Sequence, residues 1–565
     1  MLMGMAGKEL VVGLLKKEGV DGKLVESVLE VPPDSSLGDF GFPCFVLSKE
    51  WKKSPQEIAS ELAGKLKVGK GVREVKAVGP YVNFFLEVDL VSESVLKDVW
   101  KKKERYGAGG KKKGKVMVEY SQPNTHKEFH VGHLRNVALG SSLIKIMRFD
   151  GKEVIAANYI NDTGAHVAKC LWYLMKKGTK PVGNKGEWLG KVYVEATQEL
   201  EKDDSFKGEV SDVLQRLEAH EKEMDALWKE TRQWSLDAFN DVYGWLGVEF
   251  DVWFYDHEMI EGAKKFVEKL EKKGIAKESE GAIIVDLENE GLHTLVVGKS
   301  DGTIPYISKD FALASIKFEK FMIEENVYVV GSEQELHFRQ LFKILELFGF
   351  KNAKRCFHLS YDLVMLPEGK MSSRLGNVVL FSDLKNELMD SLKGEVEKRH
   401  DWPAKRVDSV AKDIAVGALM FGMLCQDHQK SIVFDLKEWL NFEGETGPYV
   451  QYAHARLRSV LRKAKKKVGA GVDFSLLSEG VELELVKLLE LFPSKVDEAA
   501  SSRRPSLIAR YCLDVAQKAN DFYHRVPVLK AEKKLMEARL LLVWATAQVL
   551  CNGLSLLGIV ALDEM

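Results

Sequence analysis

Two short motifs, far apart in the chain, carry residue types that stabilise negative charge on phosphate groups. They are His130-Val131-Gly132-His133 and Lys370-Met371-Ser372-Ser373. When a carboxylate attacks the α-phosphate of ATP, charge grows on the phosphoryl group and on the departing pyrophosphate. Two imidazoles at a helix N-terminus, and a lysine acting as a point charge on the β- and γ-phosphates, suit that task. Either motif alone is weak, but both in this order predict an ATP site.

The residues around the first motif indicate how it is positioned. Residues 116–120 have the pattern of a short strand, and apolar residues recur at helical spacing after His133. Residues 154–156 have the pattern of the next strand. This order predicts a βαβ unit, the start of a parallel nucleotide-binding sheet. Gly132 has no side chain, so we expect the backbone there to approach adenine closely.

Pattern changes along the chain predict an α/β multidomain protein. We expect an N-terminal α+β domain over residues 1–98, closed by an aromatic strand, and then a basic, glycine-containing linker over 99–115. A Rossmann-like parallel-sheet catalytic domain follows over 116–400, with a helical insertion at about 172–280. Residues 401–565 predict an all-α domain.

The composition limits which cellular locations and binding partners are expected. Lys+Arg number 82 and Asp+Glu 84, giving a net charge of -2, so any nucleic-acid face must be local. Six scattered cysteines without a C-x-x-C pair indicate neither a zinc ribbon nor a disulfide framework, and favour a reduced cytoplasmic location. The N-terminus has no apolar signal segment. Residues 540–562 carry no charge, but their polar residues favour a buried helix that stops at Asn552-Gly553 over a membrane span.

Three further segments resemble the arginyl-tRNA synthetases, a family of class I aminoacyl-tRNA synthetases whose ATP signatures the first two motifs also resemble. They are Ser121-Gln122-Pro123-Asn124, Lys299-Ser300-Asp301-Gly302-Thr303 with Tyr306 and Asp310, and the long stretch from Phe442 through Gly447-Pro448-Tyr449 to Arg456. The resemblance covers nearly the whole chain. It implies that the C-terminal helical domain binds the anticodon and that the N-terminal domain recognises the D-loop of tRNA.

An arginine pocket needs carboxylates, because a guanidinium is a permanently charged, planar fork of donors. Glu119 and Asp310 are the candidates. The resemblance implies that Tyr306 joins them at the guanidinium, and that Asn124 and Gln334 hold the α-amino group. Where many relatives have Gln, this chain has His166. We predict that His166 alters the pH dependence near neutrality if it contacts substrate.

The tRNA contacts follow from the resemblance and from residue type. Tyr81 and Asn83 align with D-loop contacts, an aromatic to stack on a base and an amide to bond its edge, although packing of Tyr81 in a small sheet stays open. In the helical domain, Tyr449, Arg456 and Tyr523 are the candidates for RNA contact. Core packing of the tyrosines is the alternative.

The resemblance implies two steps. ATP, with Mg²⁺ carried by the nucleotide and no protein metal site, activates L-arginine to arginyl-adenylate, and the 2′-OH of the terminal adenosine of tRNA-Arg then takes the arginyl group. Activation is expected to require bound tRNA. Many relatives have a degenerate second signature and a lysine upstream of the first, whereas this chain has both Lys127 and Lys370. We expect Lys370 to face pyrophosphate, and we expect a monomer that does not bind membranes.

Three other functions stay open from the sequence. A synthetase of another specificity would share the ATP motifs but lack the arginine-pocket residues. A catalytically inactive tRNA-binding relative would keep the helical domain and lose the ATP residues. A small-substrate nucleotidylyl transferase would not need the helical domain, so its activity would survive truncation beyond about residue 400.

Overall fold

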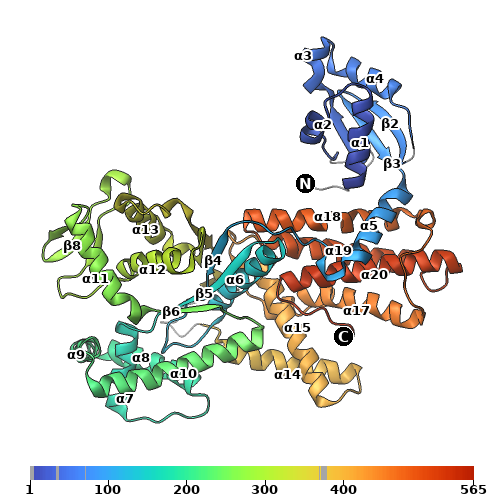
Figure 1. Cartoon of the computed structure of the whole chain (residues 1–565). Coiled ribbons are helices and arrows are strands. Elements are labelled where there is room, and N and C mark those ends of the chain that lie inside the picture. Colours follow the sequence, from blue (N-terminus) through green and yellow to red (C-terminus); the bar gives the residue numbers. More distant parts are fainter. Residues whose placement is uncertain (1–4, 33–36, 70, 368, 371–377) are drawn as a thin grey trace.

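The computed structural model describes residues 5–32, 37–69, 71–367, 369–370 and 378–565 (Figure 1). Met371, Ser372 and Ser373 of the second signature lie outside the described residues. Figure 1 shows a central sheet between two helical bodies, with the N-terminal domain standing apart at the end of one long helix. The fold is the predicted combination of a Rossmann-like parallel sheet, an N-terminal α+β domain and a C-terminal all-α domain.

A five-stranded parallel sheet forms the centre of the catalytic domain. Its order is β11-β10-β4-β5-β6. The strands are β4 (Lys115–Glu119), β5 (Glu153–Ile160), β6 (Val252–Tyr255), β10 (Glu325–Gly331) and β11 (Cys356–Tyr361). Helix α6 (Val131–Phe149) connects β4 to β5, so the predicted βαβ unit is confirmed. The carboxyl ends of the parallel strands meet at one edge, where ligands bind in such folds.

Two groups of helices accompany this sheet: the first is an inserted bundle, and the second is a layer that packs on one face of the sheet. An inserted bundle with its own apolar core contains α7 (Ala165–Lys177), α8 (Lys185–Lys202), α9 (Phe206–Glu218) and α10 (Lys222–Leu246). The second layer contains α11 (Asp256–Lys272), α12 (Tyr306–Phe321) and α13 (Glu335–Phe348). The predicted insertion at 172–280 was too long, because β6 at 252–255 returns to the parallel sheet.

Two small sheets lie beside the main one. Residues 282–285 form β8, between β7 (Lys277–Ser279) and β9 (Leu295–Gly298), so this predicted strand belongs to a separate antiparallel sheet. The other small sheet joins β12 (Val364–Leu366), β13 (Gly369–Lys370) and β14 (Ile432–Val433) in the order β13-β12-β14. It carries the backbone of Lys370.

The helical domain shares its core with the catalytic sheet. Its helices are α14 (Phe381–Arg399), α15 (Ala404–Leu424), α16 (Leu436–Trp439), α17 (Gly447–Ala464), α18 (Gly480–Ser502), α19 (Ser506–Arg525) and α20 (Lys533–Leu556). One continuous apolar cluster runs from the sheet and α6 into this bundle. The predicted boundary at 400 falls between α14 and α15, which pack on each other, and α15 also packs on α6.

Helix α20 is the uncharged segment noted in the sequence. It has the length and composition of a membrane span, but 78% of its most apolar stretch is buried inside the protein. The predicted stop at Asn552-Gly553 was wrong. The Asn552 Nδ2 atom donates to the backbone oxygens of Lys103 (2.9 Å) and Tyr106 (3.1 Å), and Gly553 packs on the Cys512 sulfur. These tertiary contacts therefore outweigh the local preference of Asn552-Gly553 for a turn.

The N-terminal domain has a separate core. It comprises α1 (Met5–Lys17), α2 (Gly22–Val28), β1 (Phe40–Pro43), α3 (Ser48–Trp51), α4 (Pro55–Lys65), β2 (Val72–Val78) and β3 (Tyr81–Leu86). Helix α5 (Val88–Lys102) joins it to the rest, so residues 99–102 are helical and not linker. Val99 is buried and the Trp100 ring lies 4.5 Å from that of Trp544, which explains why this turn is ordered.

Candidate active site

The first signature forms the start of α6. His130 is the N-cap, and its Nδ1 atom accepts a hydrogen bond from the Gly132 backbone N–H at 3.1 Å. The Nδ1 atom of His133 accepts from the His130 N–H at 3.2 Å, and the two rings lie 3.8 Å apart. Because both Nδ1 atoms accept, each neutral ring carries its hydrogen on Nε2. The pair therefore offers two Nε2–H donors to a ligand.

Both signature imidazoles are neutral. Burial, together with the nearby positive charge of Lys127, lowers the pKa of His130 to about 4. Burial, the His130 ring and Lys127 hold the pKa of His133 well below its usual value. The imidazoles thus supply dipoles to phosphate, and the cationic charge comes from lysine.

The stretch of chain that follows the second signature lies against the first signature through the backbone. The Val131 N–H donates to the Val379 oxygen (3.1 Å), the Phe381 N–H donates to the Phe129 oxygen (2.9 Å), and His130 forms an isolated bridge with Leu380. On the other side of the signature, Lys370 pairs with Met365 in the small sheet. Residues 379–381, about 250 positions downstream, are therefore neighbours of the first signature.

Lys127 belongs to the same site. Its Nζ atom lies 4.8 Å from the centre of the Tyr193 ring, and the Nζ of Lys169 lies 4.6 Å from that ring. The charge of Lys127 also contributes to the lowered pKa of His130, His133 and His166. The helical insertion thus holds Lys127 beside the first signature.

The predicted carboxylates lie near each other but are already paired. Glu119 ends β4, is buried, and places its Oε2 atom 2.5 Å from the Nζ of Lys317. The Asp310 Oδ2 atom lies 2.7 Å from His337 Nε2. Burial, together with nearby charges that include both carboxylates, raises the pKa of Tyr159 and of Tyr328. Glu119 is therefore an internally compensated charge, while Asp310 is paired with an imidazole.

Three of the other predicted arginine-site residues meet at Asn161. Its Nδ2 atom donates to Asn124 Oδ1 (2.6 Å) and to the Tyr306 hydroxyl (3.2 Å), and His166 Nε2 lies 3.4 Å from its backbone oxygen. Gln334 is exposed just after β10. Within the described ranges, no hydrogen bond joins Gln334 to the other pocket residues.

The structure argues against the predicted pH role of His166. Burial, with the charge of Lys127 next in importance, lowers its pKa to about 3. The ring is therefore neutral throughout the physiological range. A buried histidine cannot switch charge near neutrality unless a counter-charge lies close by.

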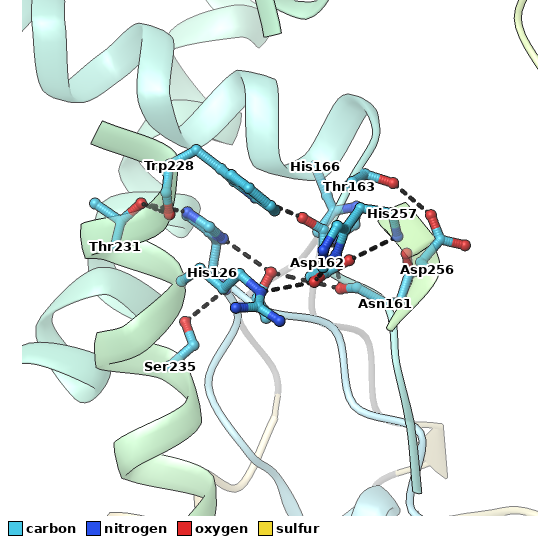
Figure 2. Close-up of polar contacts among 12 residues, drawn as sticks. His126, Asn161, Asp162, Thr163, His166, Trp228, Thr231, Ser235, Asp256 and His257 are labelled. Carbon is cyan, nitrogen blue, oxygen red and sulfur yellow. Dashed lines mark hydrogen bonds and ion pairs between the residues drawn. The ribbon is translucent and has the colours of Figure 1, made fainter. Parts of the chain in front are cut away.

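A buried polar network that the sequence did not reveal supports this pocket (Figure 2). Asp162 accepts hydrogen bonds from His257 Nδ1 and Arg232 Nε, both at 2.7 Å, and these contacts hold its pKa low even though burial opposes them. Asp256 accepts from the Tyr159 hydroxyl (3.0 Å) and from Lys309 (2.5 Å). The partners of Asp162 lie 70 and 95 residues downstream, so no local pattern connects them.

The three candidate RNA-contact residues of the helical domain form one cluster on α17 and α19. The guanidinium of Arg456 lies 5.1 Å from the Tyr523 ring centre and bonds the Asn520 side-chain oxygen at 2.9 Å. Asn520 in turn donates to the Tyr449 hydroxyl (2.9 Å). Tyr523 is 41% exposed, which leaves its ring accessible. Farther along α17, Arg458 pairs with Asp563, which reduces the positive charge predicted there.

The N-terminal candidates divide between surface and core. Tyr81 is half-buried and packs edge-on against the exposed Phe45, with ring centres 6.2 Å apart. Asn83 is 3% exposed and lies on the same face of β3 as Tyr81, opposite the core residues Val82 and Phe84. Phe45 was missed because a single aromatic in a short turn has no periodic signal.

Comparisons with known proteins agree along the whole chain. Family profiles match residues 8–86 (arginyl tRNA synthetase N terminal domain), 95–436 (tRNA synthetases class I (R), catalytic domain) and 450–565 (DALR anticodon binding domain). An arginine–tRNA ligase of Bdellovibrio bacteriovorus is 41% identical over 94% of this chain and 93% of its own length, and one of Clostridium perfringens is 40% identical over 97% and 98%. The arginyl-tRNA synthetase structure of Thermus thermophilus is 31% identical, covers 100% of both chains and superposes with a TM-score of 0.81.

Proposed function

The chain belongs to the arginyl-tRNA synthetases, class I enzymes that ligate arginine to tRNA, and we propose which of its residues perform the two steps. The observation that carries the proposal is the convergence of two groups at the carboxyl edge of the parallel sheet. One group is the first ATP signature with the residues that follow the second, and the other is the polar cluster around Asn161 with Glu119 and Asp310.

In the first step, ATP lies over the start of α6. The Nε2–H groups of His130 and His133 donate to phosphate oxygens, and the helix N-terminus adds its dipole. Lys127 and Lys370 supply positive charge to the departing pyrophosphate, with Lys370 facing the β- and γ-phosphates. Val131 and Gly132 contribute backbone only, and among the described residues the His130 ring is the side chain within 4 Å of the position that a Cβ atom of Gly132 would occupy. Mg²⁺ enters with the nucleotide.

Arginine binds at the neighbouring pocket. Asp310 and the Tyr306 hydroxyl take the guanidinium, while Asn124 and Gln334 hold the α-amino group. Glu119, whose charge is compensated by Lys317, orients the Gln122 side chain by accepting a hydrogen bond from its Nε2 atom (3.2 Å). His166 holds the Asn161 loop as a neutral group. These roles place the substrate carboxylate toward the α-phosphate.

In the second step, the 2′-OH of the terminal adenosine attacks the arginyl-adenylate and releases AMP. Tyr449, Arg456 and Tyr523 contact the anticodon region, since an exposed ring beside a guanidinium stacks on unpaired bases. Tyr81, with Phe45, contacts the D-loop, and the buried Asn83 positions that strand. We further propose that the enzyme acts as a cytoplasmic monomer.

Aminoacylation of unfractionated tRNA, tested with each of the twenty amino acids, checks the specificity. A parallel pyrophosphate-exchange assay, with and without tRNA, checks whether activation needs RNA. We expect charging with arginine alone and exchange only with tRNA present. Charging with another amino acid would overturn the pocket assignment but leave the ATP site standing. Separate K127A and K370A variants decide which lysine carries the larger share of the pyrophosphate charge.

A further inference from the structure

Arg135 is a fully buried arginine one turn beyond the first signature, and the proposed chemistry does not use it. Its side chain lies in α6 at 0% exposure. The guanidinium donates to backbone oxygens of two separate segments. It bonds Asp362 (2.7 Å) and Leu363 (3.1 Å) in the first segment, and Asp427 (3.4 Å), His428 (3.2 Å) and Lys430 (2.6 Å) in the second.

Those two segments lead directly into paired strands. The first enters β12 and the second enters β14, and the strands pair in parallel as Val364 with Ile432 and Met365 with Val433. The Ile432 N–H also donates to the Leu363 oxygen at 3.0 Å. Strand β12 in turn pairs with β13, where Met365 lies opposite Lys370. One guanidinium therefore connects α6, which starts at the first signature, to the small sheet that carries Lys370.

The cost of burying this charge makes the arrangement informative. Burial lowers the pKa of Arg135 to about 10, while Tyr361, Asp362 and Asp427 oppose that effect. A buried cation is costly unless its donors are satisfied. Both terminal nitrogens of the guanidinium bond carbonyl oxygens, while its Nε has no hydrogen-bond partner among the described residues, and a planar fork is the side chain that reaches several carbonyls at once. Lysine offers three donors from one point and cannot span both segments equally.

We propose that Arg135 is a positioning residue that holds the β12–β14 platform, and with it Lys370, in register with His130 and His133. This inference rests on the proposed action of Lys370 on the phosphates of ATP. Arg135 acts through the backbone of the platform and does not touch substrate. Loss of the guanidinium lets the platform move relative to α6, so the ATP step weakens while arginine binding is kept.

Steady-state pyrophosphate exchange in the full-length enzyme tests the proposal. We expect R135K to lower kcat/KM for ATP by about tenfold to a hundredfold, since small misplacements of a positioned group cost that much, with the KM for arginine within about twofold of wild type. R148K is the matched control, because Arg148 is on the same helix and also donates to a backbone oxygen, that of Val154 (2.9 Å). Wild-type ATP kinetics in R135K would overturn the proposal. An equal loss of kcat/KM for ATP and for arginine would also overturn it.

Hydrogen–deuterium exchange separates positioning from global damage. Peptides spanning 362–366 and 430–434 should exchange faster in R135K than in wild type, whereas peptides of the N-terminal domain should not change. Unchanged exchange in those two peptides would overturn the anchoring role. R135A is the stronger variant, and R135K carries the test if R135A does not fold.

A double-mutant cycle links the platform to Lys370. In the K370A background, R135K should cause little further loss of kcat/KM for ATP, because the lysine that Arg135 positions is already absent. An undiminished defect in that background would overturn the inference. Wild-type ATP kinetics in K370A alone would instead overturn the proposed role of Lys370, a result that is obtained without any change at Arg135.

Discussion

At the scale of single residues, neutral histidines surround the active site. The pKa is lowered to about 4 for His130 and to about 3 for His126 and His166, in each case first through burial. His126 bonds the hydroxyls of Thr125 (3.0 Å) and Thr231 (2.8 Å), which satisfy both ring nitrogens without charge. In the proposed ATP site, the positive charge therefore comes from the lysine side chains and not from these histidines.

The lowered pKa values predict a stability that declines on the acid side. A histidine whose folded pKa lies below its unfolded value contributes stability that is fully present above about pH 6.5, and this is lost as pH falls toward the folded pKa. We expect the Tm of wild type to fall between pH 6.5 and 4.5, and the fall to be smaller in H166Q. H220Q, at an exposed histidine, should keep the wild-type slope. Thermal unfolding across this pH range is the measurement, and equal slopes in wild type and H166Q would contradict the assignment.

Substitution of Asp310 should affect arginine binding most selectively. D310N removes the charge while keeping the shape and the contact with His337. A lost charge-assisted hydrogen bond is worth about 1.5–3 kcal/mol, so the KM for arginine should rise by about tenfold to a hundredfold, with the KM for ATP little changed. D286N, at an exposed carboxylate of the same domain, is the control. Unchanged arginine kinetics in D310N would refute the pocket.

At the scale of elements, the start of α6 illustrates how backbone and side chains share one task. Gly132 sits where a Cβ atom would lie 2.9 Å from His130 Cε1 and 3.0 Å from its Nδ1. The sequence predicted an open space for adenine, and the structure adds that the first neighbour is the His130 ring. A side chain at this position therefore disturbs the ring that caps the helix.

A Gly132→Ala substitution tests this geometry. The added methyl group must push the His130 ring away from its hydrogen bond with the Gly132 N–H, so we expect the KM for ATP to rise by about tenfold, the cost of a weakened cap and a misplaced donor. Gly208→Ala in α9, where a Cβ atom meets nothing within 4 Å, is the matched control. Fluorescent-nucleotide binding, alongside pyrophosphate exchange, measures the effect. ATP binding equal to that of the control would mean that the ring accommodates the methyl group freely.

At the scale of the whole molecule, the two terminal domains differ in their independence. The N-terminal domain has its own core and meets the helical domain through α5 and an ion pair between Asp39 and Lys487 (2.6 Å). The C-terminal helices continue the core of the catalytic domain, where the Ser142 hydroxyl of α6 bonds the Leu556 oxygen of α20 at 2.9 Å.

Truncation should expose this difference. A variant that begins at residue 88 keeps α5 and should fold, with a Tm within a few degrees of wild type. A variant that ends at residue 400 uncovers the apolar face of α6 and should aggregate, because a core exposed on one side loses most of its burial free energy. Soluble yield and thermal unfolding of both variants provide the test. A folded, soluble 1–400 fragment would contradict this prediction.

The sequence correctly predicted the features that depend on strong local residue patterns. The βαβ unit, the parallel sheet, the two signatures and the family resemblance all rest on short-range spacing, which side-chain periodicity encodes directly. Most errors concerned boundaries. The linker began inside α5, the insertion was assigned across β6, and α20 passed through Asn552-Gly553, because in each case distant partners outweighed a local preference.

By itself, the sequence determined the family to which this protein belongs, because the residue types in its motifs are sufficient to indicate that family and to propose residues for an ATP site and an arginine pocket. Only the tertiary structure decided the ionisation and the pairing of those residues. Whether Glu119 is free or bound to Lys317, whether His166 titrates near neutrality, and what Arg135 holds all depend on atoms that lie far away in the chain. Charge states respond to burial and to neighbours in space, and neither quantity is a property of a local segment.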